Sequence, residues 1–172
     1  MTYAAGVDDR AVVAEQIGRE PRAFRRVVVR CPFGYPAVTD QMPYCEAGDP
    51  FPTTYYLTCR HLVAAISRVE AAGGVERWSL AAREDHALAA SLEEANAEQR
   101  TVRRELAGPG PWPDAGASLE LGIGGSSRGG SLKCLHAHAA YALVHPRYEL
   151  GQLILAELDP LWPRDRCCST LG

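Results

Sequence analysis

Apolar residues recur at helical spacing in several stretches of this chain, and glycine or proline marks the breaks between them. Residues 8–19 open with acidic residues and place three apolar side chains on one face, which predicts a short amphipathic helix. The same spacing predicts a helix over 60–72, which ends at a glycine pair. A long helix is expected over 80–106, which lacks glycine and proline. Further helices are expected over 131–144 and 149–158.

Two segments have the composition of strands. Residues 24–31, FRRVVVRC, contain a β-branched run, and residues 53–59, TTYYLTC, are rich in threonine and tyrosine. The intervening PFGYPAV, residues 32–38, is interpreted as a turn because of its prolines and glycine. Cys31 and Cys59 therefore each stand where a strand is expected to end.

We predict a single α+β domain over residues 1–172 that is mainly helical and has a small β-sheet. The Gly- and Pro-rich stretch 107–130 is predicted to be a flexible loop, and 159–172 a frayed tail. The narrow apolar stripe of the 80–106 helix indicates a helix that is packed on one side and solvated on the other.

Charge and composition restrict the class of protein. A net charge of -3, with no basic run longer than two arginines, argues against nucleic-acid binding. No apolar run is long enough for a membrane span, and the N-terminus has no basic segment followed by an apolar core. We therefore expect a cytoplasmic protein whose six cysteines are reduced.

The candidate chemistry lies in SLKCLHAHAAYALVHP, residues 131–146. If a helix begins at Ser131, one face presents Cys134, His138, Tyr141 and His145 at i, i+4, i+7 and i+11. A cysteine and a histidine four residues apart can bind one metal ion, but a pair has too few ligands.

The strand-end residues Cys31 and Cys59 are the obvious source of further thiolates. Together with Cys134 and a histidine they would form a Cys₃His set, which suits zinc or an iron-sulfur cluster. Buried cysteines that only fill the core, and a histidine with ordinary hydrogen bonds, are the structural alternative. Cys45, in a turn, and Cys167-Cys168, in the tail, are interpreted as incidental thiols.

A second mechanism uses Cys134 as a nucleophile. Its position in the first turn of the expected helix, beside Lys133, favours the thiolate, and His136 or His138 could act as the base. The preceding glycine-rich run could present backbone amides to a small anionic substrate, together with Arg128 and Lys133. That run lacks the order of a nucleotide-binding P-loop.

Four blocks in this sequence resemble a bacterial family, domain of unknown function 501. They are RCPFGYPAV (30–38), GDPFPTTYYLTC (48–59), SRVEAAGG (67–74) and KCLHAH (133–138), and the resemblance extends over about residues 10–151. The family has no established activity, so the resemblance supports the choice of candidate site residues but does not identify a reaction.

The resemblance implies a site at Cys31, Cys59, Cys134 and His136. The family motif has cysteine or histidine at the position of Cys59, an alternation that a metal ligand permits. His136 thereby becomes a stronger candidate ligand than His138. The chain departs from the family pattern at Tyr141, where relatives carry a histidine, and in the HPRYELG segment that begins at His145.

We therefore predict a metalloprotein with a zinc or iron-sulfur site at Cys31, Cys59, Cys134, His136 and His138, which could be an enzyme acting on a small anionic substrate. The alternative is a non-catalytic regulatory protein that binds a protein partner or a second copy through the 80–106 helix. A thiol enzyme that uses Cys134 is the third interpretation. Burial of Leu80, Leu88 and Leu92 within one chain would argue against the regulatory interpretation.

Overall fold

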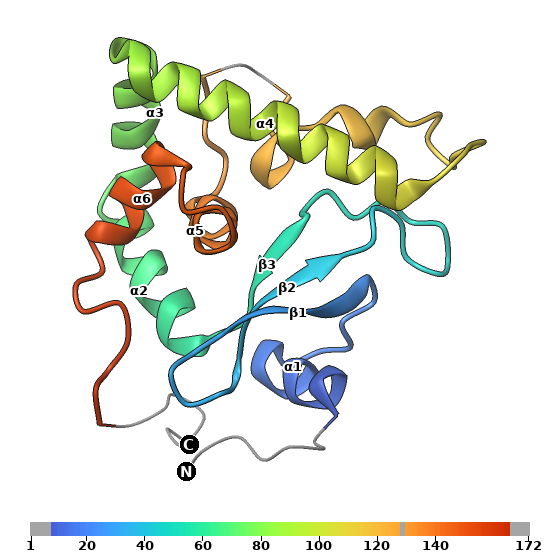
Figure 1. Ribbon diagram of the computed structural model, residues 1–172, viewed down its shortest axis with the longest axis horizontal. Coiled ribbons are helices and arrows are strands. Elements are labelled where there is room, and N and C mark those ends of the chain that lie inside the picture. The colour runs from blue at the N-terminus through green and yellow to red at the C-terminus, as the bar shows by residue number, and fades with distance from the viewer. Residues whose placement is uncertain (1–7, 128–129, 166–172) are drawn as a thin grey trace.

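The computed structural model describes residues 8–127 and 130–165 of the chain. Within these ranges it contains six α-helices, three strands and two short 3-10 helices (Figure 1). They are α1 (Asp9–Ile17), β1 (Phe24–Arg30), β2 (Pro36–Gln41), β3 (Tyr55–Leu57), α2 (Arg60–Ala71), α3 (Gly74–Glu84), α4 (His86–Ala107), η1 (Ala117–Glu120), η2 (Ile123–Gly125), α5 (Leu135–Val144) and α6 (Glu149–Ala156). The prediction of a mainly helical α+β fold with a small sheet is confirmed.

The three strands form one antiparallel sheet in the order β1-β2-β3. Helix α1 packs against one face of this sheet, whereas α5 and the helices around it lie on the other side (Figure 1). Because side chains alternate along a strand, Thr39 and Gln41 of β2 share one face, and Val38 and Asp40 share the opposite face. The sheet therefore separates two distinct layers of the molecule.

Strand β2 corrects the sequence prediction, which assigned 32–38 to a turn. All six of its residues are buried because it is the central strand and is covered on both faces. A strand buried on both faces has no apolar and polar alternation to reveal it. Its carboxylate at Asp40 is accommodated by the β1 side chains of Arg25 and Arg26, at 2.7 and 3.0 Å.

The helix predicted over 80–106 is in fact two helices, α3 and α4, which separate at Asp85. Asp85 has an extended backbone, and its side chain accepts hydrogen bonds from the backbone N–H groups of Ala87 (2.8 Å) and Leu88 (3.2 Å). It is the N-cap of α4, a role for which aspartate is well suited. Composition alone did not reveal this break, because residues 80–106 contain no glycine or proline to mark it.

Helix α5 lies at the centre of the helical layer. Leu135, Ala139 and Ala140 are at most 1% exposed, and α6 packs on the same helix. Within the stretch 107–130, predicted to be a loop, α4 ends at Ala107, and residues 108–127 and 130 contain no α-helix or strand. The stretch does form η1 and η2, and it buries Leu119 and Ile123 in the core. Of the predicted tail, residues 166–172 lie outside the described ranges.

Candidate metal centre at the start of helix α5

Cys134 is the N-cap of α5 and precedes its first helical residue. The prediction that this helix begins at Ser131 is therefore wrong by about one turn. The cause is a tertiary contact: Leu132 is buried, and its N–H donates to the Ser79 hydroxyl of α3 (3.1 Å), which keeps the approach to the helix extended. The face that was expected to run from Cys134 to His138 consequently does not exist as one helical stripe.

His136, and not His138, lies beside the cysteine. Cys134 Sγ is 3.8 Å from His136 Nδ1, and the same nitrogen is 3.3 Å from a carboxylate oxygen of Glu70. The three ligand atoms all lie within 4.8 Å of one another. In the described part of the chain this is the one group of three or more such side chains with that spacing.

The opposite ring nitrogen of His136 faces helix α2. Nε2 lies 3.2 Å from the backbone carbonyl oxygen of Val63 and 3.2 Å from the Ser67 hydroxyl. Because a carbonyl oxygen only accepts hydrogen bonds, Nε2 carries the hydrogen in this arrangement. The lone pair of a neutral His136 is then on Nδ1 and is directed at Cys134 and Glu70. Hydrogen bonding to Cys134 raises the pKa of His136, and burial opposes this effect.

Glu70 is the functional candidate that sequence reasoning missed. It lies in α2, where Val63, Ser67 and Glu70 stand at i, i+4 and i+7 and so share one helix face. Its carboxylate also accepts a hydrogen bond from the Leu135 N–H at 2.6 Å, which ties α2 to the start of α5. The block SRVEAAGG contains both Ser67 and Glu70, so the signal was present, although nothing in the block itself pointed to the histidine.

The other predicted site residues lie apart from this group. Cys31 follows β1 and Cys59 is the N-cap of α2; both are buried, and neither belongs to the group formed by Glu70, Cys134 and His136. Their participation in a Cys₃His set stays a prediction. Lys133 donates its ammonium hydrogen to the carbonyl of Gly125 in η2, at 3.0 Å. Three further residues, Arg128, Cys167 and Cys168, lie outside the described ranges.

His138 belongs to a different environment. It is 1% exposed, and its Nδ1 lies 2.7 Å from the Tyr148 hydroxyl. Burial lowers the pKa of His138 to about 3, so the ring is neutral over the physiological range.

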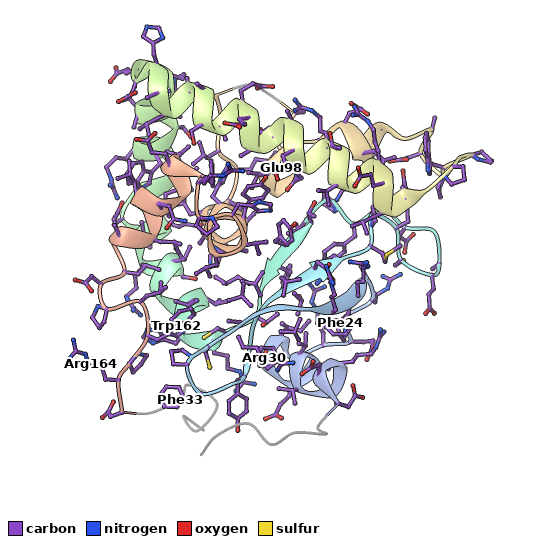
Figure 2. The ribbon with its side chains drawn as sticks, viewed as in Figure 1. Phe24, Arg30, Phe33, Glu98, Trp162 and Arg164 are labelled. Atoms are coloured by element: carbon purple, nitrogen blue, oxygen red, sulfur yellow. The ribbon has the colours of Figure 1, made fainter. Side chains whose placement is uncertain are left out.

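Tyr141, at the position where the family resemblance implied a histidine, is buried and donates its hydroxyl hydrogen to Glu98 at 2.7 Å. Glu98 lies on the side of α4 that faces α5 (Figure 2). His145 stacks on the Tyr141 ring with centroids 4.2 Å apart, and its Nδ1 is 3.4 Å from Glu98. These side chains border a cavity of about 290 Å³ between α4 and the end of α5.

The interface predicted along the 80–106 helix has little exposed apolar surface. Leu88 and Leu92 are 7% and 2% exposed and belong to the core, whereas Leu80 is 46% exposed but lies on α3. Of the three leucines expected to form a partner-binding surface, only Leu80 is exposed, so the interpretation loses most of its support.

No helix in residues 8–127 and 130–165 is long and apolar enough to cross a bilayer.

Comparison with known proteins gives one match. Neither the curated proteins nor the solved structures contain a match to this chain. A family model described as protein of unknown function (DUF501) matches residues 27–156, which include both strand-end cysteines, Glu70 and the start of α5. The chain therefore belongs to the DUF501 family.

Proposed function

We propose that this protein binds a single zinc ion through Cys134, His136 and Glu70. The observation that supports the proposal is the approach of a thiol, an imidazole nitrogen and a carboxylate oxygen to within 4.8 Å of one another. These three donor types are the ones that zinc accepts. An iron-sulfur cluster needs several thiolates, and this group offers one, so it suits zinc better.

The interatomic distances agree with a shared tetrahedral ion. With zinc-ligand bonds near 2.3 Å for sulfur and 2.1 Å for nitrogen and oxygen, tetrahedral angles require a sulfur-nitrogen distance of about 3.6 Å and a nitrogen-oxygen distance of about 3.4 Å. The corresponding distances in this protein are 3.8 and 3.3 Å. Only small side-chain adjustments are needed.

The surroundings of His136 also suit a ligand. The hydrogen bond between its Nε2 and the Val63 carbonyl fixes the ring and leaves Nδ1 available, which is the usual arrangement of a histidine ligand and its supporting partner. Three protein ligands leave one position of a tetrahedral ion for water or an anionic substrate, where zinc supplies Lewis-acid chemistry. Glu70 also holds the Leu135 N–H, so this carboxylate both orients α5 and contributes a donor.

A Cys-His-Glu catalytic triad fits these contacts less well. In such a triad the histidine contacts the nucleophile through one ring nitrogen and the carboxylate through the other. Here both Cys134 and Glu70 face Nδ1, and Nε2 faces α2. The ring therefore does not stand between the two groups.

The test is zinc binding by the purified chain and by single variants. We expect one zinc per chain by elemental analysis, and a thiolate-to-metal absorption band when cobalt replaces zinc. Cys134→Ser should abolish the band, and His136→Ala or Glu70→Gln should weaken zinc binding at least about tenfold. Cys45→Ser is the matched control and should bind zinc as the unaltered protein does.

Cys31→Ser and Cys59→Ser, measured in the same series, decide between the two ligand sets. Retention of zinc by both variants is the result that the present proposal requires. Loss of zinc in either one would restore the three-cysteine set. Absence of metal from every protein, with rapid alkylation of Cys134 near neutral pH, would instead favour the thiol enzyme.

A further inference from the structure

A second cavity, of about 170 Å³, lies on the opposite side of the sheet from the candidate metal centre. Helix α1 contributes Val13 and Ile17 to its wall, and the segment after β2 contributes Phe51. Tyr56 of β3 completes the apolar lining, with its ring centroid 6.1 Å from that of Phe51 and the two rings tilted by 56°. Two tilted aromatic rings facing aliphatic side chains form a slot that suits a flat apolar ring.

The sheet side of this cavity is polar. Thr39 and Gln41 of β2 both line it, although they are 0% and 4% exposed. Gln41 Nε2 donates to the Thr39 hydroxyl at 2.6 Å, and this is the one side-chain hydrogen bond that Gln41 makes within the described residues. Its amide oxygen is thus available to a hydrogen-bond donor in the cavity. A ligand N–H or O–H group that reaches this oxygen would find a hydrogen-bond acceptor in the cavity wall.

Among the described charged residues that line the cavity, one positive charge is not paired with an acidic side chain. Arg22 is paired with Asp49 at 2.6 Å, and Glu20 is paired with Arg10 at 2.6 Å. Arg19 also lines the cavity, and in the described part of the chain its guanidinium forms no ion pair and donates only to the Tyr56 hydroxyl, at 3.3 Å. An anionic group at the mouth would complete the pairing of charges.

We propose that this cavity binds a small monocarboxylate that bears a flat ring with an N–H or O–H donor. The ring packs between α1 and the aromatic pair, the donor reaches the Gln41 amide, and the carboxylate pairs with Arg19. The wall formed by α1 precedes residue 27, where the family match begins, so the proposal concerns this chain and not the family. It is independent of the zinc site.

Indole-3-acetate is a suitable probe because it combines an indole N–H with a carboxylate on a flat ring. We expect saturable binding to the full chain by isothermal titration calorimetry, with a dissociation constant in the micromolar to low millimolar range. Indole-3-acetamide, which lacks the charge, should bind about two- to fivefold more weakly, as expected for one partly exposed ion pair. Arg19→Gln should produce the same loss, whereas Arg83→Gln, an equal charge change at an exposed residue of α3, should leave binding unchanged.

The donor contact is tested by a double-mutant cycle between ligand and protein. 1-Methylindole-3-acetate should bind more weakly than indole-3-acetate to the unaltered protein. In Gln41→Leu, which replaces the amide by an apolar side chain of similar size, the two probes should bind equally. Circular dichroism and thermal melting confirm that the variant is folded, and a methyl penalty that persists in folded Gln41→Leu would contradict the contact.

Cys45 lines the same cavity, so its reactivity reports whether the ligand binds there. Bound indole-3-acetate should slow the alkylation of Cys45 by iodoacetamide, followed by tandem mass spectrometry, and leave the rate at Cys134 unchanged. Absence of saturable binding, binding that does not respond to Arg19→Gln, or an unprotected Cys45 would each overturn the proposal.

Discussion

At the scale of single residues, His138 and His136 show that neighbouring histidines of one helix can serve opposite purposes. His136 is partly exposed and directs Nδ1 at a thiol and a carboxylate. His138 is fully buried, and its Nε2 has no hydrogen-bond partner among the described residues. A buried ring with one unsatisfied nitrogen disfavours the charged form, which has two N–H groups to satisfy.

His138 makes the stability of the fold depend on pH. A histidine side chain ordinarily has a pKa of 6.5, and burial lowers the pKa of His138 to about 3 in the folded protein. Between these values the unfolded chain binds more protons, so acidification lowers the free energy of unfolding by up to about 1.4 kcal/mol per pH unit. His138→Leu should flatten that dependence between pH 6 and 4, measured by urea unfolding at each pH.

Tyr148→Phe is the control for this experiment, because it removes the hydrogen-bond partner of His138 and leaves the histidine buried. This variant should be less stable at every pH but keep the slope of the unaltered protein. Equal slopes in His138→Leu and the unaltered protein would show that His138 titrates normally in the folded state.

At the scale of elements, capping decides where the helices begin and end. Asp85 divides an otherwise continuous helical sequence into α3 and α4 by accepting two N–H groups of α4. Asp85→Ala should therefore lower the free energy of unfolding by about 1 kcal/mol. Asp85→Asn retains an oxygen acceptor and should lose much less stability. Thermal unfolding measures both variants. An equal loss of stability in the two would show that the charge of Asp85, and not its hydrogen bonds, stabilises the helix.

The contact between α5 and α6 depends on a single glycine. A Cβ at Gly151 would lie 2.4 Å from Tyr148 Cδ1 and 2.6 Å from the Ala142 side chain, distances that folded proteins do not sustain. Gly151→Ala should destabilise the fold by about 1–3 kcal/mol, despite the higher helix propensity of alanine. Leu153→Ala, at a 42% exposed residue of the same helix, should change denaturant stability by less than about 1 kcal/mol.

At the scale of the whole molecule, the sheet separates the candidate zinc site from the α1 cavity. One lies between α2 and α5, and the other between α1 and the sheet. Distant sites with no shared partner generally behave independently. Cys134→Ser should thus bind indole-3-acetate within about twofold of the unaltered protein, and Arg19→Gln should retain its zinc. A larger change in either measurement would reveal coupling through the sheet.

The sequence by itself determined the local elements with apolar periodicity or β-branched runs. Helices α1, α2 and α6 and strand β1 are confirmed close to their predicted bounds, because the spacing of apolar residues and the terminating glycines are properties of short segments. Strand β2 was missed because its burial on both faces arises from its neighbours. The start of α5 was misplaced because a contact with α3 holds Leu132 out of the helix.

For the candidate site, the sequence determined Cys134 and His136, since they stand together in KCLHAH. Only the tertiary structure decided that Glu70 joins them, because a helix 65 residues earlier must pack on the start of α5 before its carboxylate reaches the Leu135 N–H and the imidazole. The tertiary structure likewise decided that His138 is a core residue and formed the α1 cavity from two distant segments. Local spacing determines which residues share an element, whereas the packing of elements determines which of them meet.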